Sequence, residues 1–179
     1  MESNPSIKKE LLGDAAHWMR VVFSMLLFSL LALNFVALNA TVRHGSMERA
    51  LSDGDRIIAF RLAYVVRPPG RHDVVVFRRG ATGRDLYVKR VIGLPGDEVM
   101  VSGGEVFVNG AAERGFAAGA TPGELGPVLV PDGHVFVLGD NRGGSQDSRH
   151  WPEIFVPVES VLGRAVLRYY PVFGLVGGA

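Results

Sequence analysis

A lysine stands in the middle of an apolar, strand-like segment. Residues 85–97 are rich in Tyr, Val and Ile, and Gly-Leu-Pro-Gly closes the run, which predicts a β-strand that ends in a turn. Because side chains alternate between the two faces of a strand, Lys89 shares a face with Tyr87 and Val91, whereas Arg90 points the other way. Burial would lower the pKa of Lys89, so that its amine could accept a proton. Taken alone, the segment favours the alternative, an exposed face on which the lysine reaches water.

The nucleophile that such a base could serve is restricted by composition. The chain has no cysteine, which excludes disulfides, thiolate metal sites and a cysteine nucleophile. A hydroxyl such as that of Ser46 needs a base to remove its proton, and a desolvated lysine or a histidine could supply it. His150 is the best histidine candidate, but no histidine lies in a segment that suggests the carboxylate partner of a triad. For Ser46 considered alone, a helix-capping role is more common.

A polar segment, residues 139–149, is the third candidate region. It follows a predicted strand at 135–138 and contains two Asp, two Arg and two Ser among its eleven residues. A surface loop with Asx turns would explain this composition. The alternative is an internal network of charge-assisted hydrogen bonds, which would hold the loop in one shape at the edge of a site.

One apolar segment stands apart from these candidates. Residues 21–42 carry no charge, and as a helix of about 33 Å they would be long enough to cross a bilayer core. The run is too long for a cleaved signal peptide. We therefore expect a cytoplasmic tail at 1–20, a transmembrane helix at 21–42 and a β-rich domain at 43–179. The charges that flank the helix do not set its orientation.

The region after the apolar segment predicts short strands separated by turns that contain Gly or Pro. The expected strands are 56–66 (interrupted by polar residues), 73–77, the segment that holds Lys89, 98–102, 105–108, 134–138 and 161–170. Residues 111–126 are rich in Gly and Ala and are expected to form a loop or an ordered excursion of modest size. We predict a mostly β fold: an antiparallel sandwich or a coiled, barrel-like sheet, with the N-terminal transmembrane helix attached.

The order of these segments resembles bacterial type I signal peptidase. The matching segments are the apolar helix, Ser46-Met47, Asp73–Phe77, Tyr87–Asp97, and Gly139–Arg142 with Ser145, Asp147, Ser148 and Arg149. The resemblance extends to Ala165. It implies a membrane-bound serine endopeptidase that cleaves signal peptides from exported preproteins, with its catalytic domain on the periplasmic side of the bacterial inner membrane. It also implies that substrates bind as an added strand, with small residues one and three positions before the cut.

The resemblance gives a role to each matching residue. Ser46 corresponds to the nucleophile, and Lys89 to the general base that deprotonates it and later the attacking water. The backbone N–H of Ser46 corresponds to an oxyanion donor. The supporting residues are Met47 next to the nucleophile, Tyr87 packed beside the lysine, Ser145 orienting its amine, the ion pair of Asp147 and Arg149, and their neighbours Asp140, Asn141 and Arg142. Arg90, on the opposite strand face, is expected to support the structure.

Several positions depart from the family pattern. The nucleophile motif usually reads Ser-Met-x-Pro-Thr-Leu, whereas this chain has Arg49 and Ala50 in place of Pro and Thr, so the backbone restraint of proline is missing. His44 stands where many members have a Ser or Thr as second oxyanion donor, so its imidazole is a candidate donor. His72 replaces a glycine. These departures favour a specialised peptidase with few substrates, and they leave open a catalytically weak homologue that only binds preproteins.

Charge and composition indicate which partners to expect. The formal net charge is +1 and the 19 basic residues are scattered, so no nucleic-acid-binding surface is indicated. The expected partners are preprotein signal peptides and the lipid bilayer. No metal or other cofactor is expected.

Overall fold

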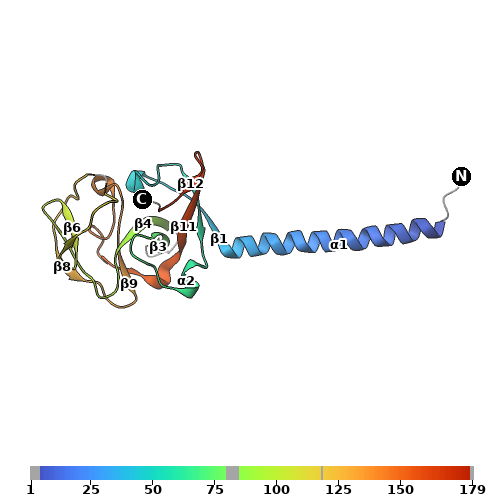
Figure 1. The fold of residues 1–179 in the computed structure, drawn as a ribbon, viewed down its shortest axis with the longest axis horizontal. Coiled ribbons are helices and arrows are strands. Elements are labelled where there is room, and N and C mark those ends of the chain that lie inside the picture. Colours follow the sequence, from blue (N-terminus) through green and yellow to red (C-terminus); the bar gives the residue numbers. More distant parts are fainter. Residues whose placement is uncertain (1–4, 80–84, 118, 178–179) are drawn as a thin grey trace. The chain divides into compact units, whose positions relative to one another are not determined.

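The computed structural model describes residues 5–79, 85–117 and 119–177 (Figure 1). The chain falls into two compact units, Met1–Val36 and Ala37–Ala179. The second unit contains all the candidate catalytic residues.

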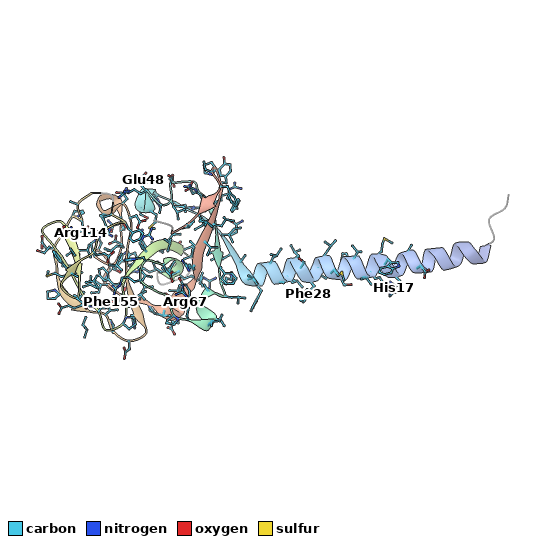
Figure 2. All side chains as sticks on the ribbon, in the orientation of Figure 1. His17, Phe28, Glu48, Arg67, Arg114 and Phe155 are labelled. Atoms are coloured by element: carbon cyan, nitrogen blue, oxygen red, sulfur yellow. The ribbon has the colours of Figure 1, made fainter. Side chains whose placement is uncertain are left out.

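The first unit is formed by helix α1 (Pro5–Val36). Its large apolar side chains are exposed within the unit. One of them is Phe28, which Figure 2 labels on the same helix as His17. Among the residues that the structure describes, no helix combines the length and apolarity needed to cross a membrane. The expected transmembrane helix at 21–42 is therefore not confirmed.

The end of that expected helix is wrong. Residues 37–41 form strand β1 (Ala37–Thr41), which pairs antiparallel with β2 (Arg56–Phe60). Ala40 is buried in the core of the second unit. An apolar run has the same composition in a helix and in a strand, and here tertiary pairing decides where the helix ends.

The larger sheet carries the candidate site. In the described residues it has eight strands in the order β1-β2-β11-β3-β4-β9-β10, and β12 pairs with β11. All the pairings are antiparallel, as predicted. The remaining strands are β3 (Val74–Arg79), β4 (Asp85–Gly93), β9 (His134–Leu138), β10 (Val156–Pro157), β11 (Val161–Tyr170) and β12 (Gly174–Leu175).

The second sheet is smaller, with four strands among the described residues in the order β7-β6-β5-β8. Its strands are β5 (Glu98–Ser102), β6 (Glu105–Val108), β7 (Ala111–Ala112) and β8 (Leu125–Leu129). Strands β5 and β6 form a hairpin that turns at Gly103 and Gly104, which both have positive φ, as expected for strands separated by turns that contain Gly. The strand expected at 56–66 is shorter than predicted, because β2 ends at Phe60 and helix α2 (Ala63–Val66) follows.

Strand β3 is buried on both faces. Val74 and Val76 belong to one hydrophobic cluster and Val75 and Phe77 to another, and none of the four is more than 1% exposed. Because both faces are covered, the apolar run is continuous instead of alternating. Its neighbour β4 is therefore held in the middle of a packed sheet, and a residue at the centre of β4 is removed from water.

Candidate active site

Strand β4 brings the lysine to the serine. Lys89 lies opposite Val75 of β3, and its Nζ donates a hydrogen bond to Ser46 Oγ at 2.6 Å. Only 3% of Lys89 is exposed. Burial, together with the positive charge of Arg149, lowers the pKa of Lys89 to about 8, against the opposing effects of Asp147 and Asp140. The exposed alternative for this strand face is therefore wrong.

Ser46 sits in a single helical turn that the core anchors. The turn is the 3-10 helix η1 (Gly45–Met47), and Met47 and Leu51 insert into the hydrophobic cluster under β2 and β3, with 0% and 1% exposure. Ser46 itself is half-buried. The packing of Met47 fixes the turn while the neighbouring hydroxyl stays within reach of both Lys89 and a ligand.

The polar loop 139–149 forms the internal network that its composition suggested. Arg149 binds the carboxylate of Asp147 through Nε at 2.8 Å and Nη2 at 2.9 Å, and donates to the Arg142 carbonyl at 2.8 Å. The backbone N–H of Gly139 donates to Asp147 at 3.0 Å. Burial raises the pKa of Asp147, but these hydrogen bonds and the Arg149 charge outweigh burial and keep it below its usual value.

Ser145 lies against the nucleophile turn. It is 4% exposed, and a methyl group built on Gly139 would collide with both the Ser145 hydroxyl and the Ser46 carbonyl. The Ser145 hydroxyl is close enough to help lower the pKa of Asp147, yet within the described residues it makes no hydrogen bond of good geometry. It is not bonded to Lys89 here, so its orienting role remains a prediction.

Tyr87 and the two histidine candidates lie at different places around the site. Tyr87 packs in an aromatic cluster with Phe77 and Trp151, on the strand face that it shares with Lys89. The His150 ring lies 3.7 Å from Asp147, and it is Lys89 that contacts Ser46.

His44 is exposed, and its φ of 67° lies in the left-handed region. Its backbone N–H donates to Asp53 at 2.7 Å. The oxyanion role of its imidazole remains a prediction.

Arg90 and Asp140 form a pair that sequence reasoning only partly anticipated. Arg90 binds Asp140 through Nε at 2.8 Å and Nη2 at 2.6 Å, and both side chains are 2% exposed. The strand alternation indicated that Arg90 turns away from Lys89, but not its partner, which lies 50 residues further on. The pair ties β4 to the start of the polar loop.

Contacts from Glu113, Phe116 and Ala117 to the site were missed. Glu113 binds His72 at 2.8 Å, Phe116 lies under the Arg90 guanidinium at 4.0 Å, and the Ala117 carbonyl accepts from Arg49 at 2.6 Å. The Gly and Ala composition indicated a loop or an ordered excursion, and the sequence held no signal for the partners of these three residues. Within the described segments no group of three or more His, Asp or Glu side chains could hold a metal ion.

A buried amine with a lowered pKa, 2.6 Å from a half-buried hydroxyl, can take the proton of that hydroxyl and make it a nucleophile.

A family model described as signal peptidase, peptidase S26, matches residues 15–170. A probable signal peptidase I-2 from Synechocystis is 46% identical over 133 residues, which cover 71% of this chain and 60% of that protein.

Two further relatives come from other groups of organisms. Thylakoidal processing peptidase 1 of Arabidopsis thaliana is 38% identical over 137 residues, covering 70% of this chain and 40% of that protein. Signal peptidase I of Bacillus caldolyticus is 36% identical over 148 residues, covering 74% of this chain and 79% of that protein. The matched part of this chain thus spans 60% and 40% of the length of the first two relatives.

Proposed function

The chain belongs to the signal peptidase family, peptidase S26, and we propose that it is a serine endopeptidase that cleaves signal peptides from exported preproteins. The observation that carries the proposal is the 2.6 Å contact of Lys89 Nζ with Ser46 Oγ in a site where the lysine is buried. In this proposal Ser46 is the nucleophile and Lys89 the general base.

The proposed reaction runs in two halves. Neutral Lys89 takes the proton of Ser46 Oγ, which attacks the scissile carbonyl, and the oxyanion of the tetrahedral intermediate is bound by the Ser46 N–H. Lys89 then gives its proton to the leaving amine, so that the signal peptide remains as an ester on Ser46. In the second half Lys89 deprotonates a water molecule, which hydrolyses the ester and restores the serine.

Ser145 and the strand edges have supporting roles in the proposal. The buried Ser145 hydroxyl, not engaged in a well-formed hydrogen bond in the described residues, orients the Lys89 amine once substrate is bound. The substrate binds as an added strand. In support of this, β9 pairs with β4 only from Arg90 onward, which leaves one edge of Leu86–Val88 without a paired strand in the described part of the chain.

We also propose that the enzyme acts on the outer side of a bacterial membrane, to which α1 attaches it. The support is the run of exposed apolar side chains on α1, such as Phe23, Phe28 and Phe35. Flotation with phospholipid vesicles tests it: the full chain should float, and a chain that stays with soluble proteins would contradict the attachment.

The experiment that tests the function is cleavage of a preprotein with alanine one and three positions before the expected cut. The intact chain should release the signal peptide at that bond, as mass spectrometry of both products would show. Ser46→Ala and Lys89→Ala should each lose cleavage, whereas Ser102→Ala, a serine of β5 in the second sheet, should keep it. Full activity of Ser46→Ala would reject the dyad.

A second candidate, a processing peptidase with few substrates, is favoured by one observation. The position that usually holds proline in the family is Arg49, with φ of 90° and a side chain bound to Ala117. A panel of unrelated preproteins separates the two candidates, because a general enzyme cleaves most of the panel and a specialised enzyme cleaves one or two members.

A further inference from the structure

Asn141 holds the backbone on both sides of the nucleophile. Its own N–H donates to the Ser46 carbonyl at 3.1 Å, and its side-chain Nδ2 donates to the Gly45 carbonyl at 2.9 Å. Asn141 thus binds two successive carbonyl groups of the turn η1. In the sequence it was only a neighbour of the ion pair at Asp147.

The bond to Gly45 has a geometric consequence for the oxyanion donor. The Gly45 carbonyl and the Ser46 N–H belong to the same peptide group, and in a planar trans peptide they point in opposite directions. When Asn141 fixes the Gly45 carbonyl toward itself, it turns the Ser46 N–H away from the polar loop. The Gly45 carbonyl also accepts from the backbone N–H of Glu48 at 3.2 Å, so the Asn141 amide adds a second and shorter hydrogen bond that holds the direction of the N–H that the proposed reaction uses.

Glu48 fixes the side chain of Asn141 in turn. Asn141 Nδ2 donates to Glu48 Oε2 at 3.0 Å, and Asn141 Oδ1 accepts from the Gly144 N–H at 3.2 Å. Both hydrogens of the amide nitrogen thus have acceptors and the oxygen has a donor. A flipped amide would set its oxygen against a carbonyl and a carboxylate, so only this orientation satisfies the three partners.

We propose that Asn141 is a positioning residue for the oxyanion site, oriented by Glu48. The inference rests on the proposed function, since it concerns the N–H of the nucleophile. It predicts that losing the amide hydrogens of Asn141 weakens binding of the transition state and leaves binding of the substrate nearly unchanged.

The test is Asn141→Asp in the full chain, which keeps the shape of the side chain and removes both donated hydrogens. We expect kcat to fall about 10- to 100-fold, less than or similar to the loss of a direct oxyanion donor, with KM within about threefold. The matched control is Asn109→Asp in the turn that follows β6. Asn109 also donates to a carboxylate, that of Asp97 at 2.8 Å, and accepts from a backbone N–H at 2.9 Å. This control should keep kcat.

A second readout separates positioning from general damage. A substrate-like peptide aldehyde forms a hemiacetal with Ser46 whose oxygen occupies the oxyanion site, whereas the same peptide ending in an amide does not. In Asn141→Asp, the affinity for the aldehyde should fall by the same factor as kcat, and the affinity for the amide should stay unchanged. If Asn141→Asp does not fold, Glu48→Ala, which frees the Asn141 amide, should give a smaller loss of the same kind.

The outcomes are distinct. Unchanged kcat in a folded Asn141→Asp variant overturns the inference and leaves the proposed function intact, as does an equal loss of aldehyde and amide binding. If wild type and Ser46→Ala are equally inactive on preproteins, the proposed function fails and this inference fails with it.

Discussion

At the scale of single residues, the decisive feature is the environment of the Lys89 amine. Strand alternation identified Lys89 as a candidate base, but its own segment could not show whether it is buried. The residues that bury Lys89 come from other segments. They are the hydrophobic cluster that β3 residues form with Val91, and the polar loop with Ser145, which lies more than 50 positions later in the chain. A charged group is identifiable from local sequence, whereas its solvation depends on residues distant in sequence.

The lowered pKa of Lys89 predicts how cleavage depends on pH. The amine must be neutral to take the proton of Ser46, and burial lowers its pKa to about 8. Activity should therefore be low near pH 6, rise through about pH 8 and level off above about pH 9. Measurement of kcat/KM for a neutral peptide substrate from pH 6 to 10 tests this prediction. A flat profile would contradict a lysine base.

The same pKa predicts a stability gain in an inactive variant. Between pH 8 and about 10.4 the unfolded chain binds a proton at Lys89 that the folded chain has released, so wild-type stability rises with pH there. Below pH 8 the folded chain bears the full cost of a buried ammonium. Lys89→Met should raise the free energy of unfolding by about 1–3 kcal/mol at pH 7. Denaturant unfolding should show this gain shrinking toward pH 10; a constant gain would contradict it.

The close packing around Gly139 predicts that a side chain at this position disrupts the site, and Gly143 in the same loop provides the control. A methyl group at Gly139 would meet Ser145 and the Ser46 carbonyl, whereas one at Gly143 in the same loop meets nothing within 4 Å. Gly139→Ala should lower kcat at least about 100-fold and cost about 1–3 kcal/mol of stability, because the nucleophile turn and Ser145 must move apart. Gly143→Ala should be near wild type in both cleavage and thermal unfolding. Equal effects of the two changes would be inconsistent with the close contact.

At the scale of elements, the strands were predictable and the connections less so. Strands at 98–102, 105–108, 134–138 and 161–170 follow from alternation and turn residues, and the structure confirms them. Strand β1 was hidden in an apolar run that also suits a helix. The contacts of Glu113, Phe116 and Ala117 could not be predicted, because a backbone carbonyl and single side chains make them and leave no periodic pattern.

The nucleophile loop gives a prediction against the family motif. Arg49 has φ of 90°, which proline, fixed near −65°, cannot adopt. Arg49→Pro would restore the usual motif, yet it should destabilise the fold by about 2–3 kcal/mol and reduce cleavage. Arg49→Gly accepts this φ without strain and should retain more activity than the proline variant. A proline variant more active than wild type would show that the loop adopts another shape.

At the scale of the whole chain, the β-rich unit has its own core. Every residue of the three hydrophobic clusters in the described part of the chain lies between Leu38 and Val176. Residues 37–179 should therefore fold alone, with one cooperative thermal transition within about 3 °C of the full chain in mild detergent. A broad transition or a much lower midpoint would show that α1 contributes to that stability.

The position of β11 in the sheet has a consequence for synthesis of the protein. This strand, residues Val161–Tyr170, lies between β2 and β3, which are made some hundred residues earlier. A nascent chain that has left the ribosome only as far as the polar loop already carries both reactive groups, but the two halves of its sheet have nothing to join them. The proposed proteolytic activity should therefore arise only after β11 has left the ribosome and joined β2 to β3.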